Sequence, residues 1–242
     1  SFLSTYSEKV PFYLQVGYVN PHDVCEYLHN HEHKSVPDEI IHQTIGESEL
    51  PPLPANFEYN RDETILQQVC RRQKGALIHD KIRRAVDKWS GLQWQFYIWN
   101  YYRYVEKVDS EIGLLLNGLV ETGLASNTLI IFTSDHGEAC ASHHMFQKFT
   151  LYQESVRVPF IVASLGDQFG LEEGTIDDRH FLSGVDILPT VCDYARVKVP
   201  DSVQGQSLRP LVEGRETDWR SFAFIESNYW GRAIVTDQYK YI

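Results

Sequence analysis

The sequence lacks closely spaced cysteines. Its four cysteines, Cys25, Cys70, Cys140 and Cys192, lie far apart and form no CxxC pair. This excludes the common zinc-ribbon and thioredoxin-like spacings. Long apolar runs are also missing, so we predict no membrane-spanning helix. The first residues lack the basic-then-apolar pattern of a signal peptide. This observation carries no weight if the chain is a fragment.

Basic residues are scarce. The chain has 22 Lys and Arg against 33 Asp and Glu, a formal net charge of −11. This balance argues against a nucleic-acid binder, which needs basic surface to meet phosphates. An anionic substrate would also be repelled at long range, so any anion site must be a local cluster of cationic groups. The 242 residues are enough for one large α/β domain or two small ones.

Apolar patterns predict alternating helices and strands. Residues 101–119 repeat apolar side chains at three- and four-residue steps, which is typical of an amphipathic helix, and Gly123 stands where it would end. Further helices are expected at 63–86, 149–157 and 185–194, and strands at 10–19, 128–133, 158–163, 221–227 and 231–236. A helix followed by a buried strand favours half of a parallel βαβ unit.

Two further stretches receive structural interpretations. Residues 20–60 are punctuated by prolines and look irregular, which is typical of a functional loop or of an arm that covers the domain. Within them, the histidines at 29–33 are interpreted as a solvated loop tip. The aromatic stretch 89–104 could stack on a sugar ring, but we interpret it as packing of a helix against a sheet.

Asp135 and His136 directly follow the predicted strand 128–133. Ligands of open α/β sheets bind beyond the carboxyl ends of the strands. An adjacent carboxylate and imidazole at that edge could bind one divalent cation. Judged on spacing alone, a capping aspartate and a surface histidine are the more frequent outcome.

Two other residues could bind an anion. Lys148 lies in an otherwise uncharged run, 139–151, where its ammonium group could hold an anion near a metal. His22 follows the predicted strand 10–19 after Pro21 and could donate a hydrogen bond to a bound anion or leaving group. Each residue also has a simpler interpretation. Lys148 would then be a surface lysine, and His22 would be a turn residue.

Together these segments resemble the sulfatase family of the alkaline-phosphatase superfamily. Three segments are similar to that family. They are the Asn-Pro-His turn after strand 10–19, the stretch from Tyr102 to Leu119, which resembles the family's Tyr-Tyr-x-x-Val helix, and the segment Ile-Phe-Thr-Ser-Asp-His-Gly-Glu that ends at Glu138. The stretch 147–161 resembles its Lys-x-x-x-Tyr-Glu-Glu-Ser-x-Arg-Val-Pro segment, with Gln153 in place of the first Glu. The segments at 185–194 and 237–242 also resemble the family.

The resemblance implies an activity and a set of site residues. Asp135 and His136 match two ligands of a divalent metal, calcium in most sulfatases, with manganese or zinc as alternatives. His22 and Lys148 match residues that contact the sulfate ester, and His143 is expected to join them. The implied substrate is a small-molecule or saccharide sulfate ester.

The resemblance also implies a fold. We expect a mixed, largely parallel sheet flanked by helices, in an alkaline-phosphatase-like α/β arrangement. Residues 1–215 would form this core without its N-terminal part. Residues 216–242 would begin a small antiparallel C-terminal subdomain.

The family's nucleophile motif is missing. That nucleophile is a Cys or Ser in Cys/Ser-x-Pro/Ala-x-Arg, converted to formylglycine, and no Cys or Ser of this chain lies in such a motif. We therefore expect the chain to be truncated at its N-terminus and inactive by itself. The alternatives are a phosphodiesterase or phosphonate monoester hydrolase of the same superfamily, and a non-catalytic binding protein on this scaffold.

Overall fold

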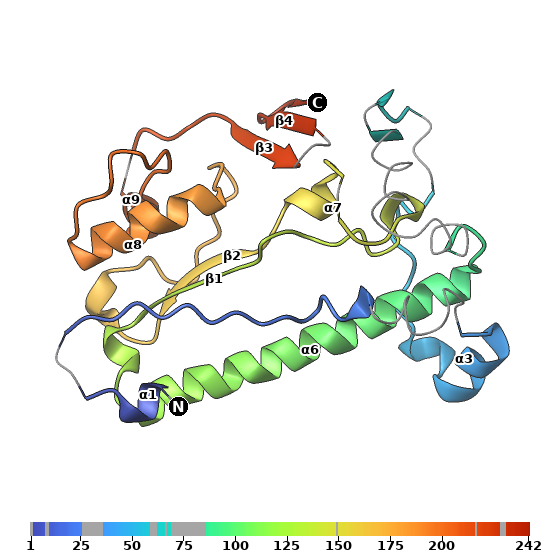
Figure 1. Cartoon of the computed structure of the whole chain (residues 1–242), viewed down its shortest axis with the longest axis horizontal. Helices are drawn as coiled ribbons and strands as arrows, with labels where there is room; N and C mark the ends of the chain where they lie inside the picture. The colour runs from blue at the N-terminus through green and yellow to red at the C-terminus, as the bar shows by residue number, and fades with distance from the viewer. Residues whose placement is uncertain are drawn as a thin grey trace.

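The computed structural model describes most of the chain, namely residues 2–7, 10–25, 36–58, 62–65, 67–68, 86–148, 150–215, 217–227 and 231–242. Its α-helices are α1 (Phe2–Thr5), α3 (Asp38–Thr44), α6 (Gly91–Glu121), α7 (Gln153–Val156), α8 (Ile187–Ala195) and α9 (Arg209–Val212). Its strands are β1 (Leu129–Thr133), β2 (Phe160–Ser164), β3 (Ala223–Ser227), β4 (Gly231–Val235) and β5 (Lys240–Tyr241). Figure 1 shows the strands and α7, α8 and α9 above the long helix α6, with α1 and α3 near its two ends.

Both ends of α6 are defined by local sequence. Ser90 and Gln93 form a capping box, in which the N–H of Gln93 donates to the Ser90 hydroxyl over 3.1 Å. At the other end Gly123 has φ +72°, a conformation that glycine adopts without strain. The predicted helix is therefore confirmed, and it begins ten residues earlier than its apolar repeat.

The aromatic start of α6 forms the main core. Trp94 and Tyr97 are fully buried, and Trp89 packs edge-on against Trp94 with ring centroids 5.1 Å apart. This confirms core packing for the first part of the aromatic stretch, whereas Tyr102 is 48% exposed. Their partners in the buried cluster are Val24, Ala141 and Phe146. The expectation that these rings pack against a sheet is therefore wrong. The apolar side chains that cover them come from the turn at Val24 and from the loop that holds Ala141 and Phe146.

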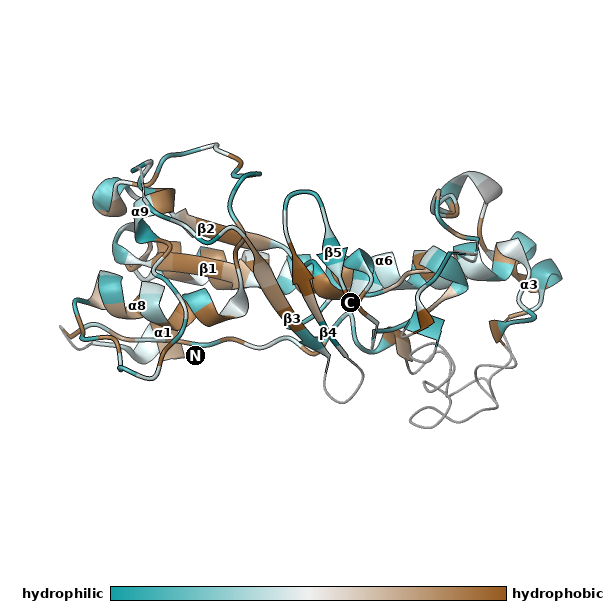
Figure 2. Cartoon of the chain, turned by 90° about the horizontal axis from the view of Figure 1, so that it is seen from above, coloured by the Kyte–Doolittle hydropathy of each residue, from teal (hydrophilic) through white to brown (hydrophobic). Residues whose placement is uncertain are grey.

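The described strands form two antiparallel sheets. β1 pairs with β2, with Leu129 opposite Ser164 and Thr133 opposite Phe160. The second sheet has the order β3-β4-β5. Parallel strand pairs do not occur among the described residues, so the parallel pairing expected for strand 128–133 is wrong there, because β1 finds its described partner in the antiparallel strand β2. Figure 2 shows hydrophobic residues along β1 and β2 and also in the sheet of β3 and β4. The domain boundary between 215 and 216 stays a prediction.

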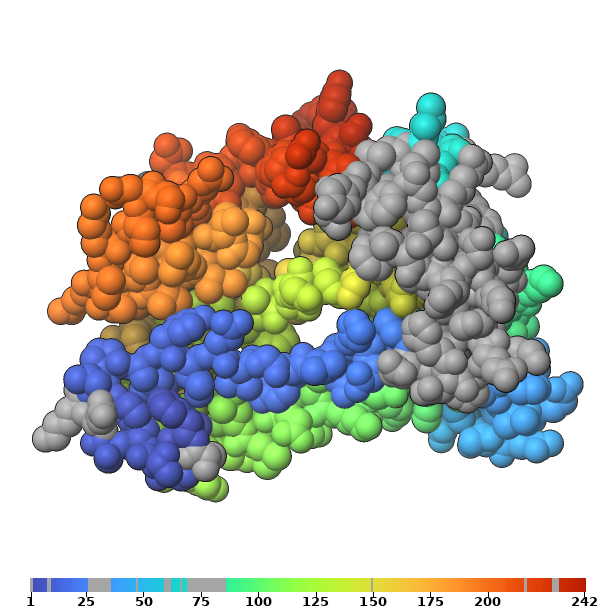
Figure 3. Space-filling view, in the orientation of Figure 1, coloured from blue at the N-terminus to red at the C-terminus, as the bar shows by residue number. Residues whose placement is uncertain are grey.

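The strand expected at 10–19 is wrong. The segment runs alongside α6 without strand pairing, as Figures 1 and 3 show. Tyr18 holds it there by donating to the carbonyl of Glu111 over 3.3 Å. Val10, Tyr13 and Val19 are 57%, 66% and 71% exposed. Apolar β-branched residues favour a strand, but a strand also needs a neighbour for its backbone hydrogen bonds, and the described residues supply none here.

Most of the remaining elements agree with the sequence. The strands and helices expected from residue 128 onward are all present, with ends shifted by a few residues. Most of the predicted helix 63–86 lies outside the described residues, as do the histidines at 29–33. Among the described helices, none is long and apolar enough to cross a membrane.

A buried ion pair joins α8 to the segment before β3. Asp186 is fully buried at the start of α8 and pairs with the guanidinium of Arg220. Its second oxygen accepts the N–H of Ser183 over 2.8 Å. A carboxylate held in this way is costly to remove, because the guanidinium would then keep its charge without the opposite charge of Asp186.

We predict that Asp186→Ala lowers the free energy of unfolding by roughly 3–5 kcal/mol. Urea denaturation followed by circular dichroism measures it. The matched control is Asp201→Ala, because Asp201 pairs with Lys198 in solvent, at 88% and 83% side-chain exposure. Equal effects of the two substitutions would contradict the prediction.

Candidate functional site

Two predicted ligands lie together beyond the end of β1. Nε2 of His136 is 3.4 Å from Oδ2 of Asp135. The Asp135 side chain is 83% exposed and that of His136 35%, so neither is packed in the apolar core. The backbone N–H of His136 donates to Oδ1 of Asp135 over 3.0 Å, which orients the carboxylate. The convergence is as expected, and the role of both as metal ligands stays a prediction.

A local hydrogen bond sets the tautomer of His136. Its Nδ1 lies 2.9 Å from the carbonyl oxygen of Gly137. A carbonyl oxygen can only accept, so Nδ1 carries the proton. In the neutral ring, the lone pair of Nε2 is then on the side that faces Asp135. This is the arrangement by which metal-binding histidines are usually oriented.

The described residues supply only part of a metal site. Among them, no group of three or more His, Cys, Asp or Glu side chains could hold a metal ion. Calcium takes roughly six to eight oxygen ligands. Asp135 and His136 therefore fit as two ligands of a divalent cation and do not form a complete site.

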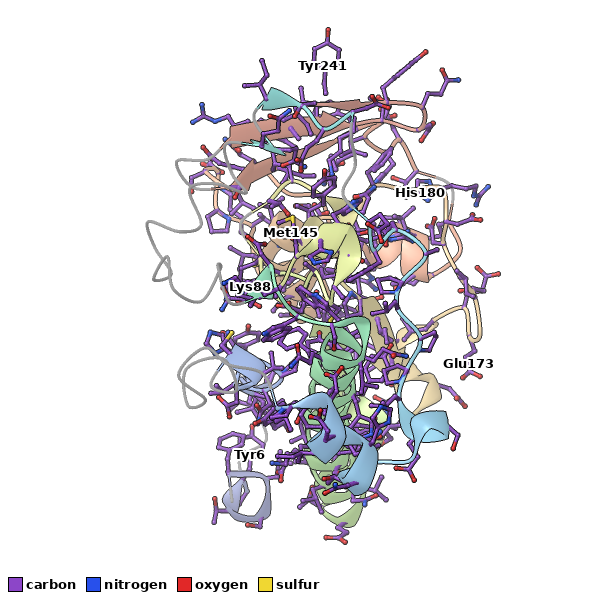
Figure 4. All side chains as sticks on the ribbon, turned by 90° about the vertical axis from the view of Figure 1, so that its right-hand side faces the viewer. Tyr6, Lys88, Met145, Glu173, His180 and Tyr241 are labelled. Carbon is purple, nitrogen blue, oxygen red and sulfur yellow. The ribbon has the colours of Figure 1, made fainter. Side chains whose placement is uncertain are left out.

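The loop of residues 137–148, called the site loop here, is tied down by backbone hydrogen bonds. Gly137 donates to the carbonyl of Ser155 over 2.9 Å, and Ala139 donates to that of Gln147 over 3.0 Å. Figure 4 shows Met145 of this loop inside the molecule, where it is 5% exposed. Lys148 is thus held to the same folded-back segment that begins at Asp135.

Glu138 binds both limbs of the site loop to α6. One oxygen, Oε1, accepts the N–H of Gln147 and, over 3.2 Å, the hydroxyl of Tyr97. Burial raises the pKa of Tyr97 well above its usual value, and the Glu138 carboxylate raises it further. Burial likewise raises the pKa of the Cys140 thiol, again with help from Glu138. Cys140 is therefore protonated at neutral pH and no activated nucleophile.

The backbone of the site loop is strained. Five of its residues other than glycine have positive φ, namely Cys140, Ala141, His143, His144 and Gln147. Such conformations cost of order 1–3 kcal/mol each and persist where the surroundings over-determine them. They cluster at functional sites, so the strain supports a functional role for this loop.

The turn that carries His22 packs against the site loop. Nε2 of Gln147 lies 3.2 Å from Sγ of Cys25, and Val24 shares a buried cluster with Phe146. His22 is exposed, and Lys148 is half-buried. The two segments are therefore adjacent, as expected for residues that contact one ester. Their contact with a substrate stays a prediction.

The His143 side chain is more enclosed than those of Asp135 and His136. Its side chain is 14% exposed, and its ring stacks on that of Tyr152 with centroids 3.9 Å apart. Nε2 lies 3.3 Å from Nδ2 of Asn56 and 3.7 Å from Oε1 of Glu154. Its backbone N–H donates to the carbonyl of Asn56 over 2.7 Å.

Sequence reasoning missed three residues of this region: Asn56, Glu138 and Glu154. Asn56 is 87 residues away from His143 in the chain, and its partner Glu154 is 98 residues away from it. No local spacing signals such a contact. The proline-rich arm to which Asn56 belongs was the one available signal, since an arm of that kind is typical of a covering or functional segment.

We predict that Gly137→Ala disturbs the site loop. A Cβ at Gly137 would lie 2.0 Å from the carbonyl oxygen of Glu154, so the backbone has to move. The free energy of unfolding should fall by roughly 1–3 kcal/mol or more, as for other overpacked sites. Urea denaturation measures it, with Gly184→Ala as the control, because a Cβ there meets nothing within 4 Å. A Gly137→Ala chain as stable as the control would contradict the prediction.

A separate cavity of about 570 Å³ opens beside the end of α8. Its lining residues are Pro189, Cys192, Asp193, Arg196, Val197, Lys198, Val199, Gly205, Ser207 and Arg209. The predicted site residues are not among them. The candidate site is therefore not this cavity but the exposed edge between β1 and the site loop.

Comparison with known proteins identifies relatives of the whole chain. A family model described as Sulfatase matches residues 1–197. An arylsulfatase of Clostridium perfringens is 29% identical over 245 aligned positions, which cover 100% of this chain and 46% of that protein. The chain thus spans about half the length of the curated relatives it matches.

Solved structures show the same fold. A 2-O GAG sulfatase matches with a TM-score of 0.73 and 28% identity, covering 92% of this chain and 47% of that one. The phosphonate monoester hydrolase of Agrobacterium radiobacter matches with a TM-score of 0.61 and 26% identity, over 78% of this chain and 42% of that one. These matches confirm the predicted alkaline-phosphatase-like α/β fold.

Proposed function

Because this chain belongs to the sulfatase family, we propose that the protein hydrolyses sulfate esters with the help of a divalent metal. The observation that carries the proposal is the pair at the end of β1. Oδ2 of Asp135 and Nε2 of His136 lie 3.4 Å apart, and the hydrogen bond to Gly137 leaves the Nε2 lone pair available. This pair lies beside the strained site loop, which contains Lys148 and His143.

Three side chains of this chain would act on the sulfate ester. Lys148 would hold the anionic sulfate oxygens as a compact positive charge, and His22 would donate a hydrogen bond to them. His143 would donate an N–H toward the ester oxygen. Because the chain as a whole carries a net charge of −11, these local donors have to supply the attraction for an anionic substrate.

The metal we propose is calcium, with Asp135 and His136 as two of its ligands. When bound, a divalent cation would polarise a sulfate oxygen. The Asp135 carboxylate suits calcium, whereas the imidazole of His136 is a ligand that manganese and zinc accept more readily. Restoring activity with each of the three metals after chelation decides between them.

The substrate class we propose is a sulfated saccharide. The support is the similarity to a 2-O GAG sulfatase over 92% of this chain. The similarity to a phosphonate monoester hydrolase keeps that activity as the alternative. Comparing kcat/KM for an aryl sulfate and for an aryl phosphonate, with the full gene product, separates the two.

Lys148→Ala in the full gene product should lower kcat/KM for an aryl sulfate by about 100- to 1000-fold. The reason is that one charge-stabilising contact in a site sheltered from water contributes on the order of 3 kcal/mol. Steady-state kinetics measures it. Lys198→Ala is the control, since the Lys198 side chain is 83% exposed. Near-normal activity of Lys148→Ala would show that Lys148 is a surface residue.

Asp135→Asn should weaken metal binding at least tenfold, or about 1.4 kcal/mol, because the amide keeps the shape and loses the charge. Calorimetric titration of the chelator-treated full gene product with CaCl₂ measures the affinity. Asp109→Asn, on the exposed side of α6, controls for the change of net charge. If both variants bind calcium as tightly as the unsubstituted protein, Asp135 is no ligand.

A further inference from the structure

The cavity of about 570 Å³ beside the end of α8, called the α8 groove here, combines apolar and charged surface. Its apolar lining includes Pro189, Val197 and Val199. Its charged lining consists of three cations and one carboxylate, namely Arg196, Lys198, Arg209 and Asp193. A volume of this size is typical of small-molecule sites, and a mixed lining can contact both the carbon and the polar atoms of a ligand.

Arg196 stands at the C-terminal end of α8 in a backbone conformation that favours glycine. Its φ is 56° and its ψ is 38°, and its backbone N–H donates to the carbonyl of Asp193 over 3.1 Å. Glycine ends a helix in this conformation without strain, whereas an arginine there is strained. Strained residues cluster at functional sites, so the presence of an arginine supports a function for its side chain.

The guanidinium of Arg196 is available to a ligand. Arg196 is exposed and lines the α8 groove. Within the described part of the chain, no carboxylate forms an ion pair with it. Arg209, in contrast, pairs with Asp193 over 3.1 Å. Lys198 pairs with Asp201 in solvent, which is a weak interaction that a ligand can replace.

These groups fit an anion that also carries hydroxyl groups. A guanidinium such as that of Arg196 can donate to two anionic oxygens at once. The Asp193 carboxylate accepts the hydroxyl of Ser207 over 2.7 Å, and each of its oxygens can accept a further hydrogen bond, so it can also bind a hydroxyl of the ligand. Val197 and Val199 offer apolar surface to the C–H groups of a sugar ring.

Asp193 also distinguishes between kinds of anion. A phosphate monoester brings about 1.5 to 2 negative charges at pH 7, and the Asp193 carboxylate would repel it. A sulfate ester is singly charged, and the hydroxyls of a saccharide can donate to the same carboxylate. The mixed charges of the α8 groove therefore favour a sulfated saccharide over a phosphorylated ligand.

We propose that the α8 groove is a second binding site for a sulfated saccharide, separate from the candidate site, with a sulfate group bound by Arg196. The choice of a sulfated saccharide rests on the proposed function, whereas binding in the groove is measurable without turnover. Figure 1 shows α8 and α9 together above the C-terminal end of α6, away from α7. A saccharide chain bound there would raise the concentration of its other sulfate esters around the protein.

Fluorescence anisotropy of a labelled heparin-derived tetrasaccharide with the chelator-treated full gene product tests the site. Arg196→Gly should raise Kd about tenfold or more, because hydrogen bonds to a charged group are lost. The variant should fold, since glycine adopts a φ of 56° without strain. The matched control is Arg179→Ala, an exposed change that removes the same charge, and it should leave Kd nearly unchanged.

An Arg196→Gly protein that binds the tetrasaccharide as tightly as the unsubstituted protein would overturn the proposal. An unsubstituted protein that does not bind it, or an equal loss of affinity in Arg179→Ala, would do the same. Two further probes define the ligand. The desulfated tetrasaccharide should bind about tenfold more weakly or worse, and inorganic sulfate at the same concentration should not displace the labelled probe. The opposite result with either probe contradicts a site for a sulfated saccharide.

Kinetics of the full gene product separates the α8 groove from the candidate site. Arg196→Gly should leave kcat/KM for an aryl sulfate unchanged, and a large loss would contradict a separate site. If the unsubstituted product hydrolyses no sulfate ester but its tetrasaccharide binding depends on Arg196, the proposed function fails and the groove site stands. If it hydrolyses the ester and binding does not depend on Arg196, the groove site fails and the proposed function stands.

Discussion

The geometry of the site depends on one constraint. The site loop folds back on itself, and its first residue packs directly against the backbone of Ser155. Gly137 donates to the carbonyl of Ser155, and there is no room for a side chain at Gly137. Glu138 then joins the two limbs of the loop, and Tyr97 joins them to the buried start of α6. Lys148 and His143 belong to this loop, so a shift at Gly137 would move the predicted ligands Asp135 and His136 relative to these two predicted anion-binding residues.

The parts of this arrangement that come from short stretches of sequence were predictable. Gly123 marks the end of α6 as expected, and the apolar run at 128–133 forms β1. The start of α6 was placed ten residues too late, because the apolar repeat was read without the capping box of Ser90 and Gln93. Asp135 and His136 are neighbours in the chain at the end of a strand. Their proximity needs only that the strand forms, and for this reason the pair could be named from the sequence.

The parts that depend on distant contacts were not predictable. The segment 10–19 has the composition of a strand, yet it lies unpaired along α6, because pairing depends on a neighbour that composition does not reveal. Asn56 lies in an irregular arm with no periodic pattern. Its position beside His143 results from the packing of that arm against the site loop, and no spacing rule relates residues 87 positions apart.

The two histidines of the site show how neighbours assign a role that residue type leaves open. The difference lies in what the Nε2 atom of each ring faces. Nδ1 of His136 donates to the Gly137 carbonyl, and in the neutral ring this leaves the lone pair of Nε2 on the side of Asp135. Nε2 of His143 faces the Asn56 amide instead, and its Nδ1 is buried. A metal bound at Nε2 of His143 would have to displace Asn56 from Glu154. The proposed ligand role therefore fits the surroundings of His136 and not those of His143.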